Sequence, residues 1–251
     1  MILIADSDRN LRDEINLLSR DNPFGCRIAA LYGTYDYSLP FVDFWVQFIG
    51  GEPVSLVSRL ETVFILRLTE KSDMDEISAF MRVSGADSVI CDGAYVLDCG
   101  MKAETGPILA CSSHQSLNGD YKIIVPTAKQ VYSIISQCQS EHFSVPPYES
   151  FMLDVNHKLL KKTVRTYAVD VDGPAACIMT LAESSDCAVL GALATVPEHR
   201  REGYGSYLIK YINNILVDEG KRVFLHRAPD SNIEFYNQLG FELYGIWSEY
   251  R

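Results

Sequence analysis

The segment from Cys187 to Gly220 constrains the fold of this chain most strongly. An apolar run over 187–196 is followed by Pro197, by a turn with two glycines one residue apart, and by apolar residues that repeat every three or four positions. Gly220 ends this repeat as a helix C-cap. The pattern predicts a strand that passes directly into an amphipathic helix, as in a layered α/β structure.

Further elements are predicted on both sides of this unit. In the second half we expect strands over 121–125, 163–171, 175–183, 222–226 and 241–248, helices over 128–138 and 151–162, and a short helix between Ser231 and Gly240. In the first half we expect helices over 8–18 and after Ser72-Asp73, and strands over 41–49, 54–57 and 61–68. Tight turns between strands are expected at Gly50-Gly51 and Asp172-Gly173.

The length of the chain favours two domains. It has 251 residues, whereas one domain usually has about 100 to 150. Between Gly106 and Pro147 the composition loosens, with Asn118-Gly119 and Pro146-Pro147 as breakers. We therefore predict a boundary near 115–125, with an N-terminal α+β domain over 1–120 and a second domain over 121–251.

Composition and charge exclude several classes of protein. Hydrophobic residues make up 47% of the chain and charged residues 22%, which is the balance of a folded globular protein. The net charge of −11 opposes a nucleic-acid partner, because such binding needs clustered Lys and Arg. No apolar run approaches the ~20 residues of a membrane helix and no signal peptide is visible, so we expect a cytoplasmic protein with no membrane partner. Seven cysteines without a Cys-x-x-Cys pair indicate free thiols and no metal site.

The turn between the strand and the helix carries the chemistry of the sequence. Two glycines, Gly203 and Gly205, allow a ligand to approach the backbone, and a helix start offers unpaired N–H groups, so the turn suits an anion such as a pyrophosphate. A dinucleotide fingerprint would need a third glycine where Leu208 stands, and a P-loop would need a Gly-Lys-Ser/Thr triplet that the chain lacks. Two interpretations of the turn remain: it binds a phosphorylated cofactor of another kind, or it is purely structural.

Two motifs together resemble the GNAT superfamily of acyl-CoA N-acyltransferases. The first is Arg200-Arg201-Glu202-Gly203-Tyr204-Gly205, and the second is Phe235-Tyr236-Asn237-Gln238-Leu239-Gly240-Phe241, one helix and one strand later. The resemblance covers about residues 126–251. It implies the fold class α/β (α+β), with a mixed, mostly antiparallel GNAT-like sheet flanked by helices. The first half looks similar to a degenerate GNAT fold, which lacks the Arg-x-x-Gly-x-Gly motif.

The resemblance also implies a set of cofactor-binding residues. The end of the strand would pair with the pantetheine arm and the acetyl carbonyl of acetyl-CoA, and the turn would hold the pyrophosphate. The residues at these positions are Ala194, Thr195, Val196, Arg200, Arg201, Glu202, Gly203, Tyr204, Gly205 and Ser206. Asn232 is a further candidate contact, although the family places its CoA-contacting Asn where Pro229 stands, and Asn232 equally suits a helix start.

Three residues are candidates for catalysis. Tyr236 matches the tyrosine that in many members of the family protonates the departing CoA thiolate, and its alternative role is that of a packing aromatic. Glu183 and Glu198 are the candidate bases for the acceptor amine, and a solvated surface carboxylate is the alternative for both.

The sequence as a whole therefore predicts a two-domain N-acetyltransferase. Acetyl-CoA would be the cosubstrate, and the acetyl group would pass directly to the amine of a small molecule or a peptide, without a covalent acyl-enzyme. The alternative is a catalytically silent protein that binds acyl-CoA as a sensor or scaffold. The acceptor and the oligomeric state do not follow from the sequence.

Overall fold

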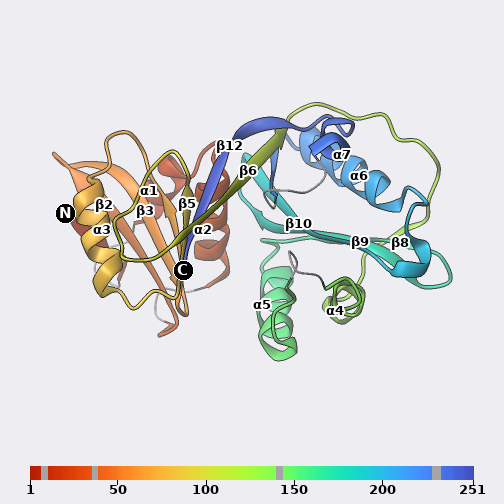
Figure 1. The fold of residues 1–251 in the computed structure, drawn as a ribbon, viewed down its shortest axis with the longest axis horizontal. Coiled ribbons are helices and arrows are strands. Elements are labelled where there is room, and N and C mark those ends of the chain that lie inside the picture. The colour runs from red at the N-terminus through yellow and green to blue at the C-terminus, as the bar shows by residue number, and fades with distance from the viewer. Residues whose placement is uncertain (7–10, 36–38, 140–143, 228–232) are drawn as a thin grey trace. The chain divides into compact units, whose positions relative to one another are not determined.

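The computed structural model describes residues 1–6, 11–35, 39–139, 144–227 and 233–251 (Figure 1). The chain divides into two compact units, an N-terminal unit of Met1–Ile108 with Leu243–Arg251, and a C-terminal unit of Leu109–Glu242. It therefore enters the second unit after residue 108 and returns to the first at residue 243. This division differs from the predicted 1–120 and 121–251, and those domain bounds stay a prediction.

The N-terminal unit is a sheet with helices on both faces. Its helices are α1 (Arg12–Leu18), α2 (Pro23–Thr34) and α3 (Met74–Val83), and its strands are β1 (Ile2–Ile4), β2 (Val42–Ile49), β3 (Glu52–Leu60), β4 (Val63–Arg67), β5 (Ser88–Asp92), the start of β6 (Ala103–Cys111) and β12 (Glu242–Tyr250). Side chains of β2 alternate between the faces, so that Phe44 packs with α1 and α2 while Trp45 packs on the α3 side.

The last strand of the chain completes the N-terminal unit. Residues 247–250 of β12 pair antiparallel with residues 89–92 of β5. Tyr250 is buried in the core beside α3, and its hydroxyl accepts a hydrogen bond from the backbone N–H of Leu97 at 3.0 Å. The first unit therefore depends on residues that lie at the far end of the sequence.

The C-terminal unit also has a sheet between two helical layers. Its strands run in the order β11-β10-β9-β8-β7. They are β7 (Ile123–Ile124), β8 (Thr166–Asp170), β9 (Pro174–Glu183), β10 (Cys187–Thr195) and β11 (Arg222–His226), and the helices are α4 (Ala128–Ser136), α5 (Tyr148–Leu160), the 3-10 turn η1 (Pro197–His199), α6 (Tyr204–Asp218) and α7 (Ile233–Asn237). Helices α6 and α7 lie on one face of the sheet and α4 and α5 on the other (Figure 1). Each face has its own core.

Both units repeat one order of elements. Two helices precede an antiparallel hairpin, a third strand, a helix, and a strand parallel to the third. In the first unit the parallel pair is β4 with β5, and in the second it is β10 with β11. The predicted fold class, a mixed and mostly antiparallel sheet flanked by helices with a second α+β part, is confirmed. Among the described residues, no helix is both long enough and apolar enough to cross a membrane.

Candidate functional site

Strand β10 separates from β11 halfway along its length. Residues 187–190 pair with residues 222–225 of β11, but β10 continues to Thr195. On its other side β10 stays paired with β9 as far as Thr195, which lies opposite Ala176. The edge of β10 that faces away from β9 therefore has no strand partner after Leu190 among the described residues. Backbone N–H and C=O groups on that edge can pair with an extended, amide-bearing ligand.

A β-bulge lies where the two strands separate. Gly191 is opposite Met179 and Ala194 is opposite Cys177, so β10 has one extra residue. Ala192 adopts a left-handed φ of 50° within this bulge. A bulge bends its strand and increases the local twist, which directs β10 away from β11. The bulge is not among the predicted features, although the small residues Gly191 and Ala192 were a signal for it.

The turn between β10 and α6 presents free backbone donors. Arg201 and Gly203 have left-handed φ angles of 71° and 85°, and Gly203 is the N-cap of α6 with no side chain that caps the helix. Within the described part of the chain, the backbone N–H groups of residues 203–206 donate no hydrogen bond. Successive free N–H groups at a helix start form an anion-binding concavity with a partial positive charge. The turn therefore has free N–H groups of the kind that an anion needs, and its role as a pyrophosphate cradle stays a prediction.

The two arginines of the motif have different surroundings. Arg200 folds back on the strand end, where its Nε donates to the Thr195 carbonyl at 3.3 Å and its Nη2 lies 3.8 Å from the Cys138 thiol. The same thiol donates to the Thr195 carbonyl at 3.3 Å. Arg201 is exposed and forms no hydrogen bond or ion pair with the rest of the described chain. Arg200 thus anchors the turn, whereas Arg201 is available to an anion.

The other predicted cofactor residues lie on or beside the same turn. Ala194 and Val196 are buried against α4 and α5, Tyr204 is buried on the α6 side, and Gly205 and Ser206 are half-buried in the first turn of α6. The Glu202 carboxylate lies 3.5 Å from His199 Nδ1. Glu198 is exposed on η1, two residues after Val196. Asn232 lies outside the described residues.

Tyr236 lies in α7 and packs on the core of the C-terminal unit. Its ring is half-buried and meets Phe235 and Phe241 edge-on, at centroid distances of 5.1 and 6.4 Å. Burial raises the pKa of the phenol, and the nearby positive charge of Arg227 offsets only part of this rise. The phenol is therefore protonated at neutral pH, as a proton donor must be.

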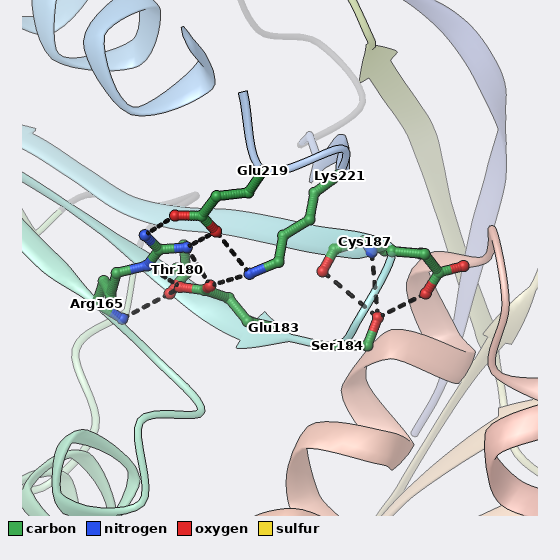
Figure 2. Close-up of polar contacts among 8 residues, drawn as sticks. Arg165, Thr180, Glu183, Ser184, Cys187, Glu219 and Lys221 are labelled. Atoms are coloured by element: carbon green, nitrogen blue, oxygen red, sulfur yellow. Dashed lines mark hydrogen bonds and ion pairs between the residues drawn. The ribbon is translucent and has the colours of Figure 1, made fainter. Parts of the chain in front are cut away.

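The structure does not bring Glu183 to the strand opening. Glu183 is paired with Ala188, whereas Thr195 is opposite Ala176, so Glu183 lies about 23 Å along β9 from the strand end. Its side chain is 6% exposed and contacts Arg165 Nη2 at 2.5 Å and Lys221 Nζ at 2.8 Å (Figure 2). Burial opposes its ionisation, but the hydrogen bonds from Arg165 and Lys221 outweigh burial and lower its pKa. A carboxylate held in this way is a structural ion-pair partner.

The thiols and the potential metal ligands give no second site. All seven cysteines are free, and six of them are buried. Throughout the described ranges, no group of three or more His, Cys, Asp or Glu side chains is placed to hold a metal ion. The strand opening and the turn that follows it are thus the features that carry chemistry.

Comparison with known proteins shows which families and folds are similar to this chain. Residues 174–251 match the family described as FR47-like protein. No curated protein matches the chain. Among solved structures, a tandem GNAT protein from the clavulanic acid biosynthesis pathway is similar, with 14% identity, a TM-score of 0.59, and coverage of 100% of this chain and 98% of that chain.

Two further structures are similar over nearly the whole chain. A GNAT-family acetyltransferase from Colwellia psychrerythraea has 11% identity, a TM-score of 0.55, and coverage of 100% of this chain and 98% of that one. A Drosophila protein has 11% identity, a TM-score of 0.63, and coverage of 99% and 97%. The resemblance is confirmed at the level of the fold: the whole chain is similar in fold to tandem GNAT proteins, and residues 174–251 match the FR47-like family.

Proposed function

We propose that the C-terminal unit binds acetyl-CoA and transfers its acetyl group directly to the amine of a small molecule or a peptide. One observation carries the proposal: the unpaired edge of β10 leads directly into the free N–H groups of residues 203–206. Acyl-CoA has two matching parts, an extended arm with two amides and a pyrophosphate. The GNAT fold of the chain supports the same cofactor.

The reaction needs little beyond positioning. The amine nitrogen attacks the thioester carbon, a C–N bond forms, and the C–S bond breaks. A backbone N–H on the open edge near Ala192–Thr195 is suited to stabilise the oxyanion of the tetrahedral intermediate. The CoA thiolate takes a proton from Tyr236, whose raised pKa keeps that proton available. The proton of the amine passes to solvent or to Glu198, the predicted base that lies beside the strand end.

The proposal also covers the kind of acceptor, the location of the protein and its metal requirement. With a net charge of −11, the protein is suited to a small amine or a peptide rather than to a nucleic acid. We propose a cytoplasmic location and no metal requirement. The cradle turn and Tyr236 together favour an enzyme over a silent acyl-CoA sensor.

Substitution of Gly203 tests the proposed cradle. Gly203→Asp places a carboxylate next to the free N–H groups, and Asp tolerates a left-handed φ better than most residues do. We expect this variant to lose measurable acetyl-CoA binding and turnover, whereas the uncharged Gly203→Asn keeps part of both. Gly220→Asn is the matched control, because Gly220 has a φ of 76° at the other end of α6 with open space around it.

The measurement is the release of free CoA thiol with a panel of polyamines, amino acids, aminoglycosides and peptides. Wild-type turnover on one class of acceptor supports the enzyme. Binding of acetyl-CoA without thiol release on any of these acceptors supports the sensor. Unchanged binding by Gly203→Asp contradicts the assignment of the cradle.

A further inference from the structure

Residues 112–122, which we call the α6 strap, connect β6 to β7 and lie along helix α6. The contacts between them are His114 Nε2 with Asp218 Oδ1 at 3.0 Å, Gln115 N with Asn214 Oδ1 at 2.8 Å, Asn214 Nδ2 with Gln115 O at 2.8 Å, Asn213 Nδ2 with Ser113 O at 2.9 Å, and Lys210 Nζ with Ser116 O at 3.1 Å. These contacts follow α6 from its last turn toward its first. The strap is therefore a fixed part of the C-terminal unit, although its composition is that of a linker.

Tyr121 is the strap residue at the start of α6. Its hydroxyl donates a hydrogen bond to the Glu202 carbonyl at 3.2 Å. Its ring meets Tyr204 and Tyr207 edge-on, at centroid distances of 5.1 and 4.9 Å. A Cβ atom at Gly119 would come within 3.0 Å of the same ring, so the strap needs a glycine there to leave room for it. The hydroxyl is thus held against the backbone of the cradle turn.

The Glu202 carbonyl and the Gly203 N–H belong to one peptide group. In a planar trans peptide the C=O and N–H bonds point in opposite directions, so an atom that fixes the carbonyl also fixes the N–H. Gly203 has a φ of 85°, and glycine tolerates the other orientation of the preceding peptide as well. Without a restraint, this peptide can rotate and turn its carbonyl toward an anion.

We propose that Tyr121 is a positioning residue of the acetyl-CoA site. Its hydroxyl holds the Glu202–Gly203 peptide so that the Gly203 N–H faces the pyrophosphate and the carbonyl faces away. The inference rests on the proposed function and extends it to a residue that lies 81 positions before Glu202, outside both sequence motifs. Tyr121 acts through this one peptide and contributes no charge to the site.

Tyr121→Phe tests the role of the hydroxyl while it keeps the ring contacts with Tyr204 and Tyr207. The matched control is Tyr132→Phe, which removes a hydroxyl of α4 that donates to the Pro146 carbonyl at 3.1 Å, on the other face of the sheet from α6. The full chain is titrated by calorimetry with acetyl-CoA and with inorganic pyrophosphate. Turnover is measured with acetyl-CoA and with S-acetylpantetheine, which has no pyrophosphate. The amide signal of Gly203 is followed by NMR in the ligand-free protein.

We expect Tyr121→Phe to weaken binding of acetyl-CoA and pyrophosphate about fivefold, the effect of one lost hydrogen bond. Its kcat at saturating acetyl-CoA and its rate with S-acetylpantetheine stay at the wild-type values, and its Gly203 amide signal shifts. Tyr132→Phe changes none of these. A KM effect without a kcat effect, confined to the ligand with a pyrophosphate, separates positioning from general loss of structure.

Two results overturn the role of Tyr121. One is wild-type affinity for both ligands in Tyr121→Phe, and the other is an equal loss of rate with S-acetylpantetheine. If wild-type protein binds no acetyl-CoA, the proposed function fails instead. The Gly203 amide signal then still decides whether Tyr121 orients this peptide.

Discussion

Tyr236 packs on the core of the C-terminal unit, and we propose that it also serves as the acid. Burial among apolar neighbours raises the pKa of the phenol, so the proton is kept at neutral pH. Packing and catalysis are therefore compatible roles for this residue.

Tyr236→Phe should lower kcat about 100-fold and leave the affinity for acetyl-CoA unchanged, because proton donation matters only in the transition state. Steady-state thiol release and calorimetry measure the two effects separately. Tyr132→Phe serves again as the control for loss of a tyrosine hydroxyl. Equal kcat values for Tyr236→Phe and wild type would return Tyr236 to a packing role.

Individual residues of the proposed cradle could be singled out from the sequence because their pattern is local. Two glycines, an arginine pair and a helix start can be identified in consecutive positions. Tyr121 was not predictable, because its contact with Glu202 depends on how the strap crosses the first turn of α6. Glu183 was predicted to lie beside the acetyl site because it ends a strand, but the antiparallel register places it at the far end of the sheet.

The two ends of helix α6 have different surroundings. Its first turn is free of capping side chains, and its last turn joins an ion-pair cluster in which Arg165 and Lys221 bridge Glu183 and Glu219 (Figure 2). The cluster binds the end of the helix to β8 and β9. A helix that is held firmly at its C-terminal end can leave its N-terminal donors for a ligand.

The cluster predicts a loss of stability in acid. Hydrogen bonds from Arg165 are the largest cause that lowers the pKa of Glu219, to about 2 from an ordinary 4.5. A carboxyl group with a lowered pKa adds stability that is complete above the unfolded pKa and is lost as the pH falls toward the folded one. The free energy of unfolding should therefore fall between pH 4.5 and pH 2.

Glu219→Gln tests this dependence by urea unfolding at a series of pH values. Because the Glu219 side chain is 39% exposed, we expect a loss of at most about 1 kcal/mol at pH 7 and a shallower fall in acid. Glu198→Gln, at an exposed carboxylate, should match wild type. A variant curve parallel to the wild-type curve from pH 7 to pH 2 would contradict the assignment.

Most elements were predictable from their periodicity. Helix α2 and strands β5 and β6 were missed because their apolar residues show little periodicity. The hairpin at Gly50-Gly51, the strand β11 and the helices α3 and α6 follow the predicted ranges closely. Helix α2 was missed because it is apolar on most sides, although Asn22 caps it and Pro23 begins it. Strands β5 and β6 are short or irregular apolar runs, for which periodicity gives a weak signal.

At the scale of the whole molecule, the return of the last strand, β12, to the first unit could not be predicted. The range of β12 was predicted, but a strand's own residues do not identify its partner, and β12 pairs with β5 of the first unit. The division after residue 108 lies within β6, a continuous strand, so no linker composition marks it. The breaker-rich residues near which the boundary was predicted include the α6 strap, and the strap is held by contacts with α6.

The two units differ at the helix start that corresponds to the cradle. In the N-terminal unit, α3 begins after Asp73, whose Oδ1 accepts from the Glu76 N–H at 3.0 Å. Asp75 and Glu76 add negative charge to the same turn. A capped and acidic helix start excludes an anion, so the tandem fold should offer one acetyl-CoA site per chain.

Calorimetric titration of the full chain with acetyl-CoA tests the central claim most directly. We predict one binding event per chain, which is lost in Gly203→Asp and retained in Gly220→Asn. The absence of binding to the wild-type chain, or two equivalent sites that survive Gly203→Asp, would contradict the account.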